Sequence, residues 1–286
     1  MKIRKAVITA GGWGTRFLPV TRSQPKEMLP LINKPLIHYA VEEVIDSGIE
    51  QIILVTALGK NAIENYFDRA FELEYFLEQR GESKLFDEMR ELSNMVNICY
   101  IRQKEQLGLG HAILVTKSLV RGEPFAVLLP DDIIDSRVPA LKQMIGIFEK
   151  CNSSVVAVES LSREEITKYG VVEPKEVTER LSEVLSLVEK PTADEAPSNL
   201  GIVGRYILTP EIFGALEAVA PGKNQEIQLT DALQILLKQQ AVYAYEFEGV
   251  RYDTGYPQGW LEATIAYALK HPEFGPELRK YLRQLL

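Results

Sequence analysis

The sequence has little cysteine and little histidine. Two cysteines, Cys99 and Cys151, and three histidines occur among 286 residues. Two cysteines are too few for a disulfide framework, and neither has another cysteine or a histidine nearby at the spacing of a metal site. The composition therefore argues against a disulfide-stabilised fold and against zinc binding, and we expect both thiols to be buried structural groups.

The sequence also lacks an excess of positive charge. The 32 lysines and arginines are outnumbered by 40 aspartates and glutamates, which gives a formal net charge of −8. The average field of such a chain repels nucleic acid and anionic membranes. We therefore expect no nucleic-acid or membrane partner, and a small anionic substrate would need a local basic pocket.

Long apolar runs are absent. The basic N-terminus is followed by an apolar run that ends at Ala10, which is too short for a signal-peptide core or a membrane span. The chain is nevertheless 46% hydrophobic and long enough to bury a sizeable core. We expect a soluble, cytoplasmic protein.

Short apolar strands alternate with amphipathic helices in the first part of the chain. Residues 51–56, QIILVT, form a buried strand after a helix that Pro35 begins and Gly48 ends. Repetition of this alternation is typical of a parallel sheet covered on both faces. The expected strands are 6–10, 51–56, 97–101, 125–129 and 153–158, and further helices are expected at 111–120 and 138–150.

The chain changes character in its second part, although no linker rich in glycine, serine or proline separates the two parts. We therefore predict one domain, residues 1–286, made of a first half, a second half and a tail. These are residues 1–160, 161–270 and 271–286, with strands in the second half at 169–173, 183–188, 200–208 and 242–247. The insertion 61–95 is expected to form two or three helices broken at Gly81, and we interpret it as a helical cap or an oligomer contact.

A glycine turn follows the first expected strand. Prolines at 19, 25 and 30 interrupt the helix that a dinucleotide-binding turn requires, and the Gly-Lys-Ser/Thr sequence of a P-loop is missing. What remains is an extended loop in which Gly11 and Gly12 let backbone amides approach a ligand, with Arg16 and Lys26 reaching in from its arms. We interpret it as a loop that wraps nucleotide phosphates; the alternative is a tight turn with surface cations.

Paired acids follow the expected strand 125–129. Asp131 lies beyond the carboxyl end of this strand, where ligands bind in open α/β sheets, and Mg²⁺ prefers such hard oxygen ligands. Asp132 is interpreted as a helix N-cap or turn residue. Asp253, which precedes a second glycine turn in the sequence YDTG, is the second metal ligand that we predict.

Two further motifs carry polar groups suited to a substrate. Lys190, fixed by a following proline, can neutralise a phosphate while Glu189 accepts hydrogen bonds from sugar hydroxyls; the alternative is an exposed salt bridge. Gln103 offers a donor and an acceptor, which matches the edge of a pyrimidine, and Gly108 lets a base lie against the backbone. His111 is interpreted as a structural residue at the start of a helix.

Seven motifs resemble, in their order, those of the sugar-1-phosphate nucleotidyltransferases: GGWGTRFLP, PKEMLP, RQ…GLGHA, LPDD, YGVV, EKP and YDTG. The resemblance runs from residue 3 to about residue 270. Within that superfamily, the segments FELE, APSNLGIVGRYIL and QLTDAL are similar to the bacterial UTP–glucose-1-phosphate uridylyltransferases. Trp13 is a mild departure, because the family more often has a smaller apolar residue there.

The resemblance implies a Rossmann-like (GT-A-like) α/β fold, with a mixed, mainly parallel central sheet flanked by helices. It also implies Mg²⁺ dependence, a homodimer or homotetramer, a nucleotide-binding first half and a sugar-binding second half. The implied nucleotide contacts are Gly11, Gly12, Glu27, Gln103 and Gly108, and the implied catalytic cations are Arg16, Lys26 and Lys190. The implied sugar-phosphate contacts are Gly170, Glu189, Lys190 and Val203, and the implied metal ligands are Asp131 and Asp253.

The implied reaction is transfer of UMP from UTP to glucose 1-phosphate by in-line attack on the α-phosphate, which gives UDP-glucose and pyrophosphate. The same reaction with dTTP stays open, because uracil and thymine share the edge that Gln103 would read. A non-catalytic sensor of a nucleotide sugar is a second alternative. It predicts loss of Arg16, Lys26, Asp131 or Lys190, and all four are present.

Overall fold

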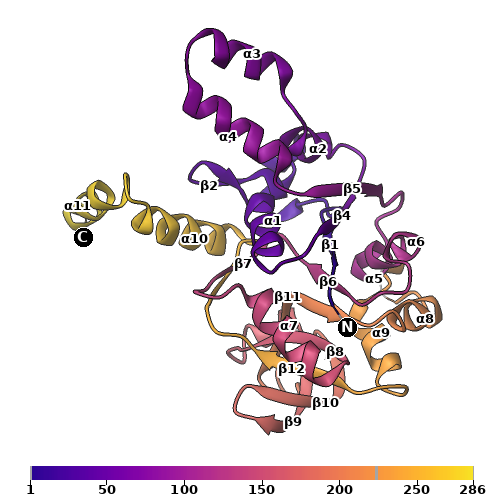
Figure 1. The fold of residues 1–286 in the computed structure, drawn as a ribbon. Helices are drawn as coiled ribbons and strands as arrows, with labels where there is room; N and C mark the ends of the chain where they lie inside the picture. Colours follow the sequence, from indigo (N-terminus) through magenta and orange to yellow (C-terminus); the bar gives the residue numbers. More distant parts are fainter. Residues whose placement is uncertain (1, 223–224, 286) are drawn as a thin grey trace.

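The computed structural model describes residues 2–222 and 225–285, and a nine-stranded sheet at its centre takes strands from both halves of the chain (Figure 1). The strands are β1 Lys5–Thr9, β4 Gln51–Thr56, β5 Asn97–Arg102, β6 Phe125–Leu128, β8 Ser154–Ser160, β9 Gly170–Thr178, β10 Leu181–Glu189, β11 Leu200–Leu208 and β12 Val242–Glu246. Their order across the sheet is β5-β4-β1-β6-β11-β8-β12-β10-β9.

Strand direction changes along the sheet. The first four strands, β5, β4, β1 and β6, are parallel, and so are β8 and β12. Strand β11 runs antiparallel to β6, β8 and β9, and β10 runs antiparallel to β9 and β12. The expected mixed sheet is confirmed, but its parallel share is smaller than expected, because the second half of the chain contributes a hairpin and a central reversed strand.

Helices cover both faces of the sheet (Figure 1). They are α1 Leu36–Asp46, α2 Asn61–Phe67, α3 Phe71–Gln79, α4 Ser83–Asn94, α5 Gly108–Leu114, α6 Lys117–Val120, α7 Ala140–Cys151, α8 Ile212–Ala218, α9 Leu229–Leu236, α10 Pro257–Lys270 and α11 Gly275–Leu285. The expected helix 111–120 is thus two helices, α5 and α6.

Alternation along β1 divides the core into two layers. Val7 packs with buried residues of α5, α8 and α9, whereas Ala6 and Ile8 pack with α1 and α7 on the other face. Successive side chains of a strand point to opposite faces, so each layer receives every second residue. Cys99 and Cys151, expected to be buried, are half-buried free thiols.

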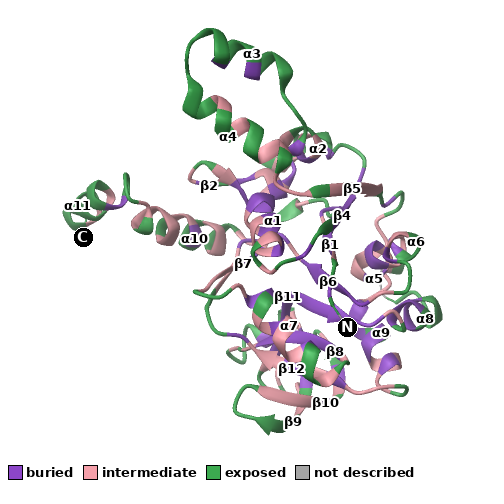
Figure 2. Ribbon diagram, in the orientation of Figure 1, coloured by how far each residue is buried: buried purple, intermediate pink, exposed green. Residues whose placement is uncertain are grey.

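The insertion 61–95 forms a helical hairpin that extends away from the sheet (Figure 2). Gly81, with φ 72°, separates α3 from α4 as expected. In α3 only Glu74 and Leu77 are buried, and none of the residues described in α4 is buried. Arg69 donates hydrogen bonds of 3.1 and 2.5 Å to Glu74, so an ion pair takes the place of an apolar core here.

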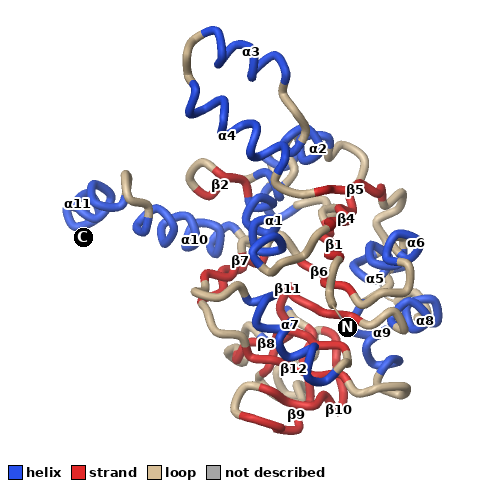
Figure 3. Tube along the Cα trace, in the orientation of Figure 1, coloured by secondary structure: helices blue, strands red, loops and turns tan. Residues whose placement is uncertain are grey.

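Residues 10–35, between β1 and α1, contain no α-helix, as the prolines predict (Figure 3). The segment is less extended than expected, since it forms three 3₁₀ turns, Thr15–Phe17, Val20–Arg22 and Lys26–Met28, and the two-residue strands β2 Pro30–Leu31 and β3 Lys34–Pro35. Across the described residues, no helix combines the length and the apolar character needed to cross a bilayer.

Candidate active site

A cavity of about 470 Å³ opens beside the carboxyl ends of β1, β5 and β6. This is the end of a parallel sheet at which ligands bind in α/β folds. Its walls come from the glycine loop, from the start of α5 and from the turn after β6. The cavity brings together seven residues that the sequence predicted for the site: Gly11, Gly12, Lys26, Glu27, Gln103, Gly108 and Asp131.

Gln103 lies at one wall of this cavity. Gly11 is close to its side chain, and Gly108 is close to the backbone of Ile227. A Cβ at Gly11 would lie 2.7 Å from Gln103 Oε1, and one at Gly108, where φ is 88°, would lie 2.9 Å from the carbonyl oxygen of Ile227. Gln103 Nε2 donates to the Gly108 carbonyl at 3.2 Å and lies 3.0 Å from His111 Nδ1. His111 therefore contacts a predicted site residue, which the sequence did not indicate.

Lys26 and Asp131, predicted for different tasks, form an ion pair in the cavity. Burial lowers the pKa of Lys26, but the charges of Asp131 and Glu27 outweigh burial and raise this pKa above its ordinary value. Burial likewise raises the pKa of Asp131, and Lys26 outweighs it, so that this pKa lies below its usual range. Both side chains are therefore charged at neutral pH.

The residues predicted to bind Mg²⁺ converge although they lie far apart in the sequence. Strand β7, Asp132–Asp135, pairs with β13, Val250–Asp253, and this register sets Asp132 opposite Asp253. A Cβ at Gly255 would lie 2.9 Å from Asp131 Oδ2 and 3.0 Å from Asp253 Oδ1. The two carboxylates therefore flank one point.

Two carboxylates suit Mg²⁺, which takes one or two of them and completes its octahedron with water and substrate phosphates. No third aspartate, glutamate, histidine or cysteine joins them in a metal-binding group within 2–222 and 225–285. The donor set therefore fits a metal that binds together with a polyphosphate.

Asp132 closes the turn after β6, since its amide donates to the Leu129 carbonyl at 3.3 Å, so the predicted turn position is confirmed and the alternative of a helix N-cap is wrong. It begins β7, is buried, and accepts hydrogen bonds from the Gly204 amide at 2.9 Å and from Arg251 Nε at 2.5 Å. Burial raises its pKa against the opposing charge of Arg251. Asp132 belongs to a strand because β7 pairs with β13, more than a hundred residues later in the chain. The local sequence around Asp132 does not predict this pairing.

Arg251, which the sequence analysis missed, compensates the charge of the acids around Asp253, one of the two predicted metal ligands. Its guanidinium lies 2.5 Å from Asp132, 3.3 Å from Glu159 and 3.6 Å from Asp253. It also donates to the hydroxyl of Tyr169 at 3.2 Å, and that hydroxyl donates to Asp253. Burial lowers the pKa of Arg251, but Asp132, Tyr169 and Asp253 together outweigh burial and raise this pKa, so the guanidinium stays charged. In the sequence, Arg251 directly precedes the YDTG motif, and this position is what could have indicated its role.

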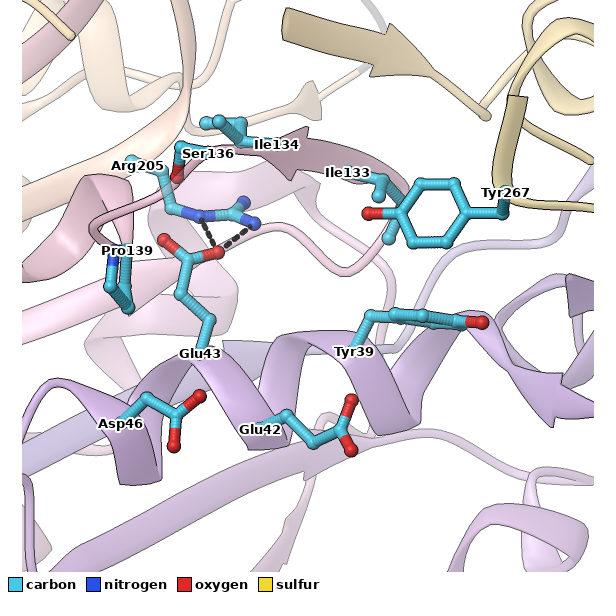
Figure 4. Close-up of a pocket in the computed structure, with 10 residues that line it drawn as sticks. All are labelled: Tyr39, Glu42, Glu43, Asp46, Ile133, Ile134, Ser136, Pro139, Arg205 and Tyr267. Carbon is cyan, nitrogen blue, oxygen red and sulfur yellow. Dashed lines mark hydrogen bonds and ion pairs between the residues drawn. The ribbon is translucent and has the colours of Figure 1, made fainter. Parts of the chain in front are cut away.

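Arg205, which pairs with Glu43 (Figure 4), also contacts the backbone of the turn that carries Asp131. Arg205 is buried and donates to the carbonyl oxygens of Leu129 at 3.0 Å and Asp132 at 2.7 Å, on either side of Asp131. Glu43 of α1 accepts from Arg205 Nε and Nη2 at 3.0 and 2.7 Å. Because these groups come from α1 and β11, the sequence gives no local sign of the arrangement.

The predicted sugar-phosphate residues form a second group. A Cβ at Gly170 would lie 3.2 Å from Glu189 Oε2, which accepts a 2.7 Å hydrogen bond from the Thr230 hydroxyl. Lys190 Nζ lies 3.3 Å from Glu189 Oε1. The backbone amide of Lys190 donates to the Tyr169 carbonyl at 3.1 Å, and the Tyr169 hydroxyl donates to Asp253, so this group is linked to a predicted metal ligand. Thr230 was missed, although it stands in the quoted QLTDAL segment.

Two predicted residues lie apart from these groups. Arg16 is exposed and stacks on Tyr256, 3.9 Å from the ring centroid, just beyond the turn that contains Gly255. The side chain of Val203 is buried in the same core layer as Ala6 and Ile8. The roles of these residues stay predictions.

Known proteins resemble this chain over nearly its whole length. A family model described as nucleotidyl transferase matches residues 5–269. UTP–glucose-1-phosphate uridylyltransferases of Staphylococcus epidermidis and Staphylococcus haemolyticus are each 49% identical over 284 residues, which is 99% of this chain and 99% of theirs.

Solved structures agree with these relatives. A UDP-glucose pyrophosphorylase in complex with UDP-glucose is 44% identical with a TM-score of 0.86, and the match covers 94% of this chain and 100% of that one. A UTP-bound UGPase from Acinetobacter baumannii is 40% identical with a TM-score of 0.92, and both chains are covered completely.

Proposed function

The chain belongs to the nucleotidyl transferase family, and on that premise we propose that it is a UTP–glucose-1-phosphate uridylyltransferase. It transfers UMP from UTP to glucose 1-phosphate and releases pyrophosphate, giving UDP-glucose. Relatives that carry this name are 49% identical over the full length, and similar structures are described as bound to UDP-glucose and to UTP. The observation that carries the proposal is that a single cavity joins the glycine loop, Lys26, Gln103 and Asp131.

The reaction needs no general base. A phosphate monoester has a second pKa near 6, so the attacking oxygen of glucose 1-phosphate is already deprotonated at neutral pH. The barrier comes from the approach of two polyanions and from the charge that develops on departing pyrophosphate. Catalysis therefore consists of positioning and electrostatic stabilisation, and the site offers cations and carboxylates for this purpose.

Each cation is proposed to hold a different phosphate. Lys26, within the cavity, binds the α-phosphate as it is attacked, and Arg16 binds the β- and γ-phosphates. Lys190 binds the incoming sugar phosphate, while Glu189 accepts hydrogen bonds from sugar hydroxyls. This division assigns the nucleotide to residues 1–160 and the sugar to residues 161–270. The proximity of Glu189, Lys190 and Gly170 supports it.

Mg²⁺ is the metal that we propose for Asp131 and Asp253, because their two carboxylates flank one point. When bound, it neutralises charge on the phosphates. Arg251 orients Asp253 and limits the repulsion between the acids, and Thr254 holds the backbone of Asp131 with hydrogen bonds of 2.8 and 2.6 Å to its carbonyl oxygen.

The base is proposed to lie between Gln103 and the glycines at 11, 12 and 108. Uracil and thymine present the same edge to Gln103, so Gln103 alone does not separate UTP from dTTP. The relatives and the UTP-bound structure favour UTP. A structure described as a glucose-1-phosphate thymidylyltransferase is only 22% identical, and its likeness shows the fold alone.

A homodimer or homotetramer is also proposed. Phe71, Tyr75 and Phe76 of α3 each expose half or more of their surface, which supports a contact between copies at the helical hairpin. Sedimentation equilibrium would measure the oligomeric state, and a monomer at micromolar concentration would contradict this part of the proposal.

One experiment tests the proposed reaction. Pyrophosphate release would be measured with UTP and dTTP against a panel of sugar 1-phosphates, with and without EDTA. We expect the fastest release with UTP and glucose 1-phosphate and none with EDTA. No release from UTP with any sugar phosphate would refute the proposal.

A further inference from the structure

Thr230, in the first turn of α9, holds one oxygen of the Glu189 carboxylate. Its hydroxyl donates to Glu189 Oε2 at 2.7 Å, and only 9% of the threonine is exposed. Hydrogen bonds to a carboxylate are stronger than those between neutral groups, and they fix the direction of the acceptor. The buried threonine therefore sets the orientation of Glu189 from a fixed place in the fold.

The two oxygens of Glu189 have different surroundings. Near Oε2, a Cβ at Gly170 would lie 2.9 Å from Thr230 Oγ1 and 3.2 Å from Oε2, so a glycine here leaves room for the hydroxyl to reach the carboxylate. The other oxygen, Oε1, lies 3.3 Å from Lys190 Nζ. The Glu189 side chain is 23% exposed and that of Lys190 is 57% exposed, so a ligand can reach this pair. The oxygen that Thr230 does not engage is therefore the one beside the exposed lysine.

We propose that Thr230 is a positioning residue for the sugar: it orients Glu189 so that Oε1 accepts a hydrogen bond from a hydroxyl of the glucosyl group. This inference rests on the proposed function, in which Glu189 binds sugar hydroxyls. The terminal torsion of a glutamate is broad, and a carboxylate that still rotates loses that freedom when a sugar binds. Because Thr230 fixes the carboxylate beforehand, it raises the affinity for the sugar without touching it.

A purely structural role for Thr230 is the alternative, because a second hydrogen bond ties the same helix to the same strand. The backbone amide of Leu187 on β10 donates to Gln234 Oε1 on α9 at 2.7 Å. This bond is as short as the one between Thr230 and Glu189, but it does not involve the carboxylate. Gln234→Met is therefore the matched control: it removes one tie between α9 and β10 and leaves the contact with Glu189 in place.

The test compares the binding of UDP-glucose with that of UDP by isothermal titration calorimetry. The Kd of UDP divided by the Kd of UDP-glucose isolates the contribution of the glucosyl group, and we call it the sugar ratio. We expect Thr230→Val and Thr230→Ala each to lower the sugar ratio by about tenfold, the scale of a lost hydrogen bond to a charged group, while the Kd of UDP stays unchanged. Thr230→Ser keeps the hydroxyl and should keep most of the sugar ratio.

A double variant shows whether Thr230 acts through Glu189. In the background of Glu189→Ala, adding Thr230→Val should change the sugar ratio by no more than about twofold, because the group that Thr230 orients is already gone. Gln234→Met should leave the sugar ratio unchanged. Turnover supplies a second readout: Thr230→Val should raise the KM for glucose 1-phosphate by about the same tenfold and leave the KM for UTP unchanged.

The outcomes separate the inference from the proposed function. If the unmodified enzyme makes no UDP-glucose from UTP and glucose 1-phosphate, the proposed function fails. If UDP-glucose forms but Thr230→Val and Thr230→Ala keep the sugar ratio of the unmodified enzyme, the proposed function stands and this inference is overturned. It is also overturned if Gln234→Met lowers the sugar ratio as much as Thr230→Val does, or if Thr230→Val lowers it equally in the presence and absence of Glu189.

Discussion

The buried ion pair between Arg205 and Glu43 should stabilise both the fold and the turn that carries Asp131 (Figure 4). Their side chains are 1% and 10% exposed. Removal of one partner of such a pair leaves an uncompensated buried charge, which costs about 3–5 kcal/mol. We therefore expect Arg205→Leu and Glu43→Leu each to lower the free energy of unfolding by about this amount, a large part of the 5–15 kcal/mol that is typical of a domain.

The double variant should cost less than the sum of the two. Removing both charges ends the electrostatic penalty, but the carbonyl oxygens of Leu129 and Asp132 still lose their donor, at about 1–3 kcal/mol each. We expect a coupling energy of at least about 2 kcal/mol between Arg205 and Glu43. Urea unfolding followed by circular dichroism would measure all three variants.

Metal activation supplies a second readout. Because Arg205 binds the carbonyls on both sides of Asp131, its loss should raise the Mg²⁺ concentration needed for half-maximal activity by about tenfold or more. The control is Lys117→Leu, which removes an exposed pair with Glu217 and should cost about 1 kcal/mol or less, without any effect on metal activation. Additive free energies for Arg205 and Glu43, or unchanged metal activation in a folded Arg205 variant, would refute the reasoning.

Three further substitutions test the proposed roles. Lys26→Ala should lower kcat by about 10²-fold or more, the scale of one lost transition-state contact, and near-normal turnover would remove Lys26 from the mechanism. Asp131→Asn should abolish metal-dependent turnover while circular dichroism shows a folded protein; an unaltered response to Mg²⁺ would contradict its assignment as a ligand. Glu189→Ala should raise the KM for glucose 1-phosphate more than that for UTP, and an equal rise in both would argue against a contact with the sugar.

Much of the fold could be predicted because local patterns carry it. QIILVT is too short and too rich in β-branched residues for a helix, and the chain indeed forms β4 there. Pro35 and Gly48 mark the ends of α1 within one or two residues. The antiparallel placement of β11 was not predictable, since pairing between distant strands depends on tertiary contacts and leaves little local trace.

The site could be predicted to the extent that its residues stand in motifs. Gly11, Gln103 and Asp131 each follow a strand, and strands that run parallel bring their carboxyl ends to one edge. Lys60 and Arg251 were missed, because their importance comes from partners 33 and 119 positions away, Glu27 and Asp132. A lysine after a strand and an arginine within a strand are common, and only the burial of their partners distinguishes these two.

We expect the hairpin of α3 and α4 to unfold locally without unfolding of the central sheet. Its helices bury two residues on α3 and none of those described on α4, so they contribute little apolar surface to the core. The free energy needed to open the hairpin is therefore small compared with that of the sheet, and the two should exchange their amide hydrogens on different timescales. In a single copy of the chain, we therefore expect residues 71–94 to open more readily than the sheet that carries the cavity, and a contact between copies at α3 should slow this opening.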